Sequence, residues 1–233
     1  MHESVTLRSA VSPRPLHLPL PLVAGGTLAL AAVAALPLDL PIAISCRQGE
    51  LPGDLEKIIV LSEVFAHGYG VLLIGLAMAL LDPVRRPQLL RVYCCAFGAG
   101  LVTGLIKCCV ARTRPLNFSF EGDVFATFLG WFPLLDPELA NRAFQSFPSG
   151  HAATAFGFAI GLSSVYPRGR WLFFILAVLA STQRVIFLAH YASDVLFAAA
   201  IGCVFPYYCV YGGPLTRWLD RWERYASGLD PTK

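Results

Sequence analysis

The chain has 233 residues, of which 56% are hydrophobic and 14% are charged, and its formal net charge is +3. A mean hydropathy of +0.61 lies outside the range of a water-soluble domain of this size, so the composition indicates an integral membrane protein. The small, scattered positive charge excludes a nucleic-acid-binding surface, which needs lysine and arginine gathered on one face.

Six apolar runs bounded by charge, proline or glycine are candidates for membrane helices. A helix needs about 20 mostly apolar residues to cross the hydrocarbon layer. The runs are 19–38, 62–81, 88–111, 151–166, 171–185 and 187–211. We therefore expect an all-α bundle of six transmembrane helices that forms a single domain over residues 1–233, because no repeat or linker divides the chain.

Lysine and arginine are concentrated in the N-terminal segment, in the loops 82–87 and 167–170, and in the tail 214–233. Short loops rich in these residues stay in the cytoplasm. This distribution predicts that both termini are cytoplasmic, in a bacterial inner membrane, and that the other loops face the periplasm. The run 19–38 is longer than the apolar part of a signal peptide, so we expect it to be a retained helix.

The second run holds Glu63 and His67, four residues apart, which we interpret as a simple helix pair. In the third loop, the segment 123–136 carries the aromatic residues Phe125, Phe128, Trp131 and Phe132. These side chains either sit at the membrane interface or form a short amphipathic element that guides a lipid towards a pocket.

Three clusters of ionisable residues fall at the predicted outer surface, and such groups are costly at membrane depth, so they usually mark function. The first is KCCVARTRP. Lys107 and Arg114 are seven residues apart, which is two helical turns, so both project from one face if the helix continues to Pro115. We interpret Arg112 as an interfacial anchor.

The second cluster is FPSGHAAT, residues 147–154, at the start of the fourth run. Pro148 and Ser149 suit the first positions of a helix, and Gly150 allows a ligand to approach the backbone. Free N–H groups and the helix dipole make such a start a site for anions, and His151 is placed to pass a proton to a bound group.

The third cluster is QRVIFLAHYASD, residues 183–194. His190 and Asp194 are four residues apart, so on one helix the carboxylate accepts a hydrogen bond from the N–H of one ring nitrogen and leaves the other nitrogen free to attack. Arg184 joins them only if the chain reverses between the fifth and sixth runs. Basic residues without a cage of carboxylates suit an oxyanion such as phosphate, so we expect neither a metal nor another cofactor.

The three clusters resemble the signature motifs of the type 2 phosphatidic acid phosphatases, the membrane branch of a superfamily that includes vanadium haloperoxidases. The matching residues are Lys107 with Arg114-Pro115, Pro148-Ser149-Gly150-His151, and Arg184, His190 and Asp194. They appear in the family's order over residues 107–194, and the six runs match its fold. One departure is Gln183, where the family usually has serine.

The resemblance implies metal-independent dephosphorylation of a membrane lipid. His190 would attack phosphorus to form a phosphohistidine, Asp194 would orient it, and His151 would protonate the leaving oxygen. The phosphate oxygens would be held by Lys107, Arg114, Ser149, Gly150 and Arg184.

We therefore expect a lipid phosphatase embedded in the bilayer, with phosphatidic acid, phosphatidylglycerol phosphate, undecaprenyl diphosphate and lipid A 1-phosphate as candidate substrates. The same residues would make a phosphotransferase if a lipid hydroxyl intercepted the phosphoenzyme. An anion transporter and a structural membrane protein with a degenerate pocket are alternatives from other classes. The sequence leaves the lipid and the oligomeric state open.

Overall fold

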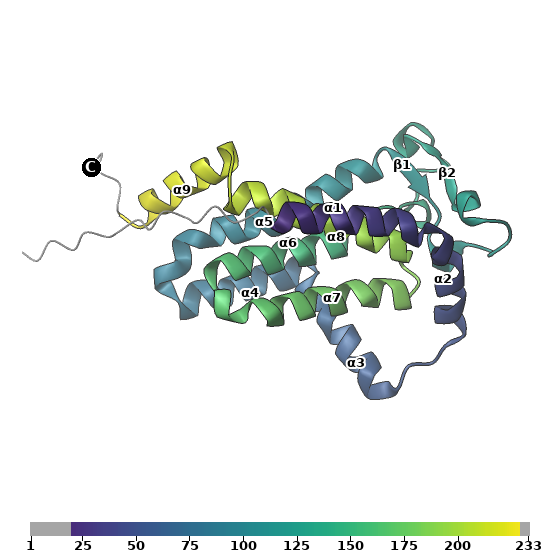
Figure 1. Cartoon of the computed structure of the whole chain (residues 1–233), viewed down its shortest axis with the longest axis horizontal. Helices are drawn as coiled ribbons and strands as arrows, with labels where there is room; N and C mark the ends of the chain where they lie inside the picture. Colours follow the sequence, from purple (N-terminus) through teal and green to yellow (C-terminus); the bar gives the residue numbers. More distant parts are fainter. Residues whose placement is uncertain (1–19, 229–233) are drawn as a thin grey trace, which may run out of the picture.

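The computed structural model describes residues 20–228 as a helical bundle with a small β-hairpin at one end (Figure 1). The α-helices are α1 (Leu20–Ala35), α2 (Asp39–Gln48), α3 (Gly53–Ser62), α4 (Gly68–Leu81), α5 (Leu89–Lys107), α6 (Gly150–Val165), α7 (Arg170–Ile186), α8 (Ala192–Val210) and α9 (Pro214–Ala226). The strands β1 (Val110–Arg112) and β2 (Phe128–Trp131) pair antiparallel. The basic residues expected before the first span, and the last five residues of the tail, lie outside the described residues.

Four helical stretches are long and apolar enough to cross a membrane, and they identify an integral membrane protein. They are Leu20–Gln48, Pro83–Lys107, Pro167–Ile186 and Ala192–Val210. A fifth is counted if Gly53–Phe65 and Gly68–Leu81, bent by 72° at their junction, form one broken span. The predicted count of six is therefore not confirmed, because the run 151–166 forms α6, whose 16 residues are shorter than the length of about 20 that a crossing needs.

Helix α6 is the centre of the bundle and packs against α5, α7 and α8. Small residues permit this close packing: a Cβ atom added at Gly157 would lie 3.2 Å from the Cβ of Ala99, and one at Gly161 would lie 3.1 Å from the Cα of Val92. Phe158 then fills the core beside them and is fully buried. A helix enclosed in this way positions its first turn rigidly.

The third predicted span ends earlier than expected. Helix α5 stops at Lys107, and the backbone of β1 pairs with β2 in the register Val110 with Trp131 and Ala111 with Gly130. Pairing with a distant strand thus replaces the last helical turn. The prediction that Lys107 and Arg114 project from one continuous helix face is wrong.

The two ends of the bundle differ. The hairpin and α2 lie at one end, and α9 lies at the other (Figure 1). Helix α9 is tied to α5 by Arg91, whose Nε is 2.6 Å from Glu223 and whose Nη2 is 2.6 Å from Asp220. The turns with Arg85 and Arg168 lead into α5 and α7 respectively, at the opposite end of each helix from Lys107 and Arg184.

Candidate active site

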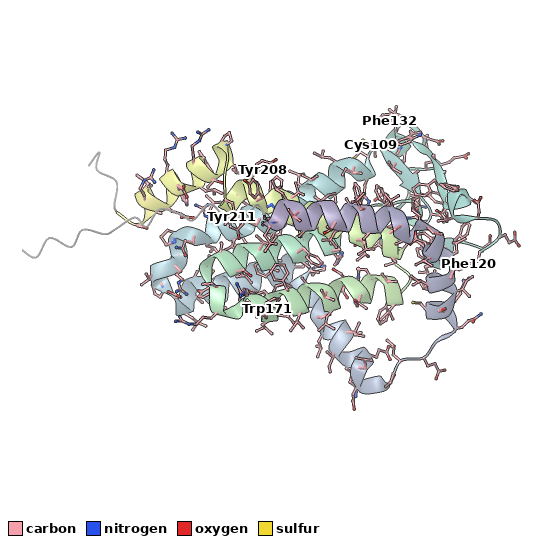
Figure 2. The ribbon with its side chains drawn as sticks, in the orientation of Figure 1. Cys109, Phe120, Phe132, Trp171, Tyr208 and Tyr211 are labelled. Carbon is pink, nitrogen blue, oxygen red and sulfur yellow. The ribbon has the colours of Figure 1, made fainter. Side chains whose placement is uncertain are left out.

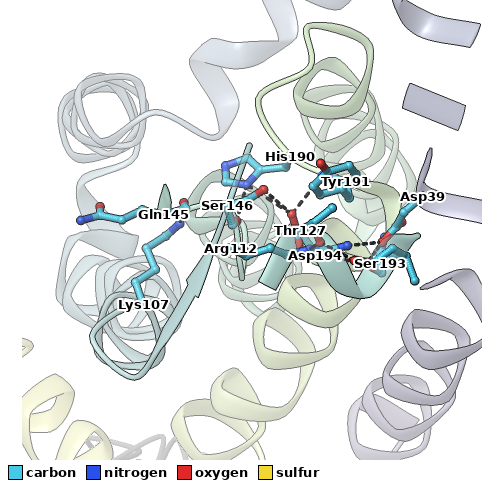
Figure 3. Close-up of polar contacts among 11 residues, drawn as sticks. Asp39, Lys107, Arg112, Thr127, Gln145, Ser146, His190, Tyr191, Ser193 and Asp194 are labelled. Carbon is cyan, nitrogen blue, oxygen red and sulfur yellow. Dashed lines mark hydrogen bonds and ion pairs between the residues drawn. The ribbon is translucent and has the colours of Figure 1, made fainter. Parts of the chain in front are cut away.

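The segment 143–149, just before α6, brings the predicted site together at the hairpin end of the bundle (Figure 3). The carbonyl of Gln145 accepts a hydrogen bond from Lys107 Nζ at 2.6 Å. The carbonyl of Ala143 accepts one from the backbone N–H of Arg114 at 2.8 Å. The N–H of Ser149 donates to the carbonyl of Asp194 at 3.3 Å. Residues from all three motifs therefore meet around one short segment.

His190 lies in the turn between α7 and α8, where the chain reverses as expected. The carbonyl of Arg184 accepts from the N–H groups of Ala189 and His190 at 3.0 and 3.1 Å, and Leu188 takes a positive φ of 56°. This reversal places the side chain of His190, which is 4% exposed, inside the site. Arg184 and His190 are thus joined by the turn itself.

The ring of His190 is held in a state suited to nucleophilic attack. Its Nδ1 is 2.5 Å from the carbonyl oxygen of Ser146, which can only accept, so Nδ1 carries the proton and Nε2 has a free lone pair. Burial, followed by the positive charges of Lys107 and Arg114, lowers the pKa of His190 well below its usual value. The imidazole is therefore neutral at physiological pH.

Asp194 does not pair with His190 along a helix, so that prediction is wrong. His190 precedes α8, and its Nδ1 is 4.0 Å from Asp194 Oδ2, beyond hydrogen-bond distance. Oδ2 instead accepts from Ser146 Oγ at 2.5 Å and from the N–H of Tyr191 at 3.0 Å, in a capping box that starts α8. Asp194 thus acts on the imidazole through Ser146.

Arg112 is fully buried, so its prediction as an interfacial anchor is also wrong. Its guanidinium donates to Asp194 Oδ1 at 2.5 Å and to Asp39 Oδ2 at 2.7 Å (Figure 3). The rings of Phe128 and Tyr191 lie 4.4 and 4.2 Å from the guanidinium carbon. The register of β2 opposite β1, which pairs Arg112 with Phe128, supplies one of these rings.

Asp39 is the main site residue that the sequence analysis missed. It begins α2 immediately after the first apolar run and is fully buried. Besides Arg112, it accepts from the N–H of Ser193 at 2.9 Å and from the Ser193 hydroxyl. A charged carboxylate at the edge of an apolar run is costly unless it pairs with a cation. The position of Asp39 was therefore the signal in the sequence that could have identified it as part of a site. We refer to Arg112, Asp39 and Asp194 as the buried ion cluster.

We call the basic residues Lys107, Arg114 and Arg184 the cationic cradle. Their side chains have fewer hydrogen-bond and ion-pair partners than those of the buried ion cluster. Arg114 Nε is buried and has no hydrogen-bond partner among the described residues. Burial and the nearby positive charges of Arg184 and Arg142 lower the pKa of Arg114. Unpaired donors in a field of like charge attract an oxyanion.

Glu63 contacts the cradle, so its prediction as half of a helix pair with His67 is wrong. It lies in a short 3-10 turn after α3, and His67 caps α4. Glu63 Oε1 is 2.8 Å from Arg184 Nη2 and 3.6 Å from His151 Nε2. Gln183 donates to Glu63 Oε2 at 3.1 Å and accepts from Arg184 Nε, so it bridges this ion pair.

The start of α6 agrees with its predicted form. Ser149 is the N-cap, and its Oγ accepts from the N–H of Ala152 at 3.4 Å. Gly150 is the first helical residue, and His151 follows with its Nε2 buried and without a hydrogen-bond partner within residues 20–228. The positive end of the α6 dipole and the imidazole of His151 therefore lie together.

The aromatic loop residues divide into two groups. Phe128 packs on Arg112, whereas Phe125, Trp131 and Phe132 are 69%, 75% and 56% exposed. Figure 2 shows Phe132 at the outer edge of the hairpin. The predicted amphipathic element is thus the strand β2 between two short 3-10 turns, Val124–Thr127 and Pro133–Leu135, and its role in guiding lipid stays a prediction.

Comparisons with known proteins place the chain in a family. The model of the PAP2 superfamily matches residues 88–218, which is more than half of the chain. A lipid A 1-phosphatase of Rhizobium johnstonii is 36% identical over 108 residues, or 46% of this chain and 40% of the relative. A lipid A 1-phosphatase of Rhizobium etli is 35% identical over 104 residues, or 45% of this chain and 41% of the relative. The matched part thus spans about two fifths of the length of these relatives.

A solved structure, of a transmembrane PAP2-type phosphatidylglycerolphosphate phosphatase from Bacillus subtilis, superposes with a TM-score of 0.49 at 17% sequence identity. The superposition covers 92% of this chain and 98% of the other.

Proposed function

Because the chain belongs to the PAP2 superfamily, we propose that it is a membrane phosphatase that hydrolyses a phosphate ester on a lipid through a phosphohistidine at His190. The observation that carries the proposal is the hydrogen bond from His190 Nδ1 to the carbonyl of Ser146 at 2.5 Å. It leaves Nε2 unprotonated, and the positive charges of Lys107 and Arg114 act on the same ring, so a nucleophile and groups that attract phosphate are close together.

In the first step, the Nε2 lone pair forms a bond to phosphorus while the bond from phosphorus to the lipid oxygen breaks. His151 transfers a proton to that oxygen, so the lipid leaves as an alcohol, or as a phosphate if the substrate is a diphosphate. The cradle, together with Ser149 and the N–H of Gly150, holds the remaining phosphate oxygens as charge redistributes among them.

In the second step, water attacks the phosphohistidine. His151, now unprotonated, takes a proton from the water, the bond from nitrogen to phosphorus breaks, and inorganic phosphate leaves. His190 returns to its starting state with Nδ1 still bonded to Ser146. The buried ion cluster keeps Ser146 and the start of α8 fixed through both steps.

Lipid A 1-phosphate is the first candidate substrate, because this compound is in the names of the two relatives. Phosphatidic acid, phosphatidylglycerol phosphate and undecaprenyl diphosphate share the same reactive group. We propose that the protein acts on one of these lipids, without a metal.

The test is phosphate release by the purified protein from a panel of these four lipids, with and without EDTA. We expect release from at least one lipid, unchanged by EDTA and inhibited by vanadate, which mimics pentacoordinate phosphorus. His190→Asn should lower the rate by a factor on the order of 10³ or more, because the nucleophile is lost. Normal turnover by this variant would exclude the proposed chemistry.

Two alternatives are separated in the same assay. Adding a lipid alcohol and following the phosphate distinguishes transfer from hydrolysis. Anion uptake into liposomes that survives His190→Ala would instead favour transport.

We further propose six membrane crossings, with α6 as the fourth, both termini in the cytoplasm and the site at the periplasmic face. The distribution of basic turns at the α9 end supports this orientation.

Cys109 is an exposed native thiol beside the hairpin (Figure 2). An impermeant maleimide should label it in intact spheroplasts, and Cys109→Ser should remove that label. A cysteine introduced by Arg168→Cys should react only after lysis; the reverse pattern would invert the topology.

A further inference from the structure

Helix α9 carries two outward stripes of side chains that the proposed reaction does not use. Residues three and four apart share a helix face. The arginine stripe consists of Arg217, Arg221 and Arg224, all exposed. The aromatic stripe beside it consists of Trp218, Trp222 and Tyr225, which are 47%, 43% and 54% exposed.

The orientation of α9 is fixed by its third face. Leu219 is fully buried, and Asp220 and Glu223 bind Arg91 of α5, which is 5% exposed. The acidic residues of α9 are therefore turned towards the bundle, and within residues 20–228 the arginine stripe forms no ion pair. In Figure 2, nitrogen-tipped side chains project from α9 away from the bundle.

Helix α9 also starts close to the membrane surface. Helix α8, a candidate span, ends at Val210, and α9 begins at Pro214 after a turn at Gly213 with a φ of 117°. Only three residues separate the two helices, so α9 cannot move far from the bilayer. A surface hollow of about 500 Å³ is lined by Pro214, Arg217, Asp220, Arg221 and Arg224.

We propose that α9 lies in the membrane interface at the end of the bundle opposite the active site, where the arginine stripe binds the phosphate groups of anionic lipids. Guanidinium groups match phosphate geometry, and tryptophan and tyrosine rings favour the depth of the headgroups. Positive charge beside exposed aromatic rings fits an anionic bilayer better than a soluble protein partner. The inference does not depend on the proposed activity.

The test uses the full-length protein in neutral detergent, with phosphatidylglycerol or phosphatidylcholine added. Lipid binding is followed by the thermal midpoint and by the lipids retained in native mass spectrometry. Phosphatidylglycerol should raise the midpoint more than phosphatidylcholine does. Raising the salt from 0.1 to 0.5 M should reduce the difference, because salt shortens the Debye length, which is about 10 Å at 0.1 M, and so screens the attraction between arginine and phosphate. Soluble glycerol phosphate should not reproduce it.

The variant Arg217→Gln/Arg221→Gln should weaken the apparent affinity for phosphatidylglycerol by about 30-fold, roughly fivefold for each arginine. The matched control is Arg168→Gln/Arg170→Gln, which removes two exposed charges, one from the turn before α7 and one from the first residue of α7. It should retain most of the selectivity. Equal losses in both variants, no loss in the first, or equal stabilisation by glycerol phosphate would overturn the proposal.

Discussion

Arg112 and Arg114 are two residues apart, but Arg112 belongs to the buried ion cluster and Arg114 to the cationic cradle, and these two regions differ in how their charges are paired. Arg112 is fully buried and has two carboxylates and two aromatic rings around its guanidinium. Arg114 has a buried Nε with no partner within residues 20–228 and has other arginines nearby. In the first region each charged side chain contacts a group of opposite charge, whereas the second has a surplus of positive charge.

This difference in charge pairing indicates that Arg112 supports the fold, whereas Arg114 is suited to binding an anionic ligand. A buried charge is tolerated when its pairing is complete, and removing one partner leaves the other uncompensated. A surplus of donors in the cradle is instead balanced when an oxyanion binds. Variants of the two regions should therefore alter different measurements.

The largest effect on stability is expected from Arg112→Gln. It leaves Asp39 and Asp194 buried without their cation, which should cost about 3–5 kcal/mol in the free energy of unfolding. Thermal denaturation in detergent measures the loss. Arg114→Gln is the matched control, with little change expected. An Arg112 variant as stable as the wild type would mean that the cluster does not support the fold.

Arg114→Gln should instead lower kcat/KM for phosphate release by a factor on the order of 10² to 10³, because a charged contact to the transition state is lost. The thermal midpoint should stay near that of the wild type. A parallel fall in the midpoint would place Arg114 in the structural region and so cancel the distinction between the two arginines.

Asp39→Asn should have an intermediate effect, about 2 kcal/mol, since the amide can still accept a hydrogen bond but loses its charge. Its effect should not add to that of Arg112→Gln in the double variant, because both changes break the same pair. Full additivity in thermal denaturation would show that the two residues act independently.

The smallest effect is a dependence of stability on pH. The pKa of His190 is lowered in the folded protein, so only the unfolded chain takes up a proton near the ordinary histidine pKa of about 6.5. The contribution of neutral His190 to the free energy of unfolding is therefore complete above that pH. It is lost as the pH falls towards the pKa of the folded state, by at most about 1.4 kcal/mol per pH unit. His190→Asn should flatten this part of the profile measured from pH 7 to 5; an unchanged slope would assign it to other groups.

The sequence by itself determined the class of protein and predicted several of the residues that the fold gathers at the candidate site. Apolar runs indicate membrane helices whatever their neighbours, and the residue types and order of the motifs, together with the family resemblance that they carry, pick out Lys107, Arg114, His151 and His190. The reversal between Arg184 and His190 also followed from the positions of the runs. These inferences use hydropathy and local order, which are properties of short segments.

The tertiary structure decided how those residues are held. Arg112 reaches Asp39 and Asp194, which are 73 and 82 positions away, and no helical or strand period relates such distances. Two other long-range contacts acted in the same way: the pairing of β1 with β2 replaced the last turn of α5, and the carbonyl of Ser146 took the place of a carboxylate at Nδ1 of His190. Burial supplies the physical reason, since a charge removed from water takes whichever partner the fold brings near it, regardless of sequence separation.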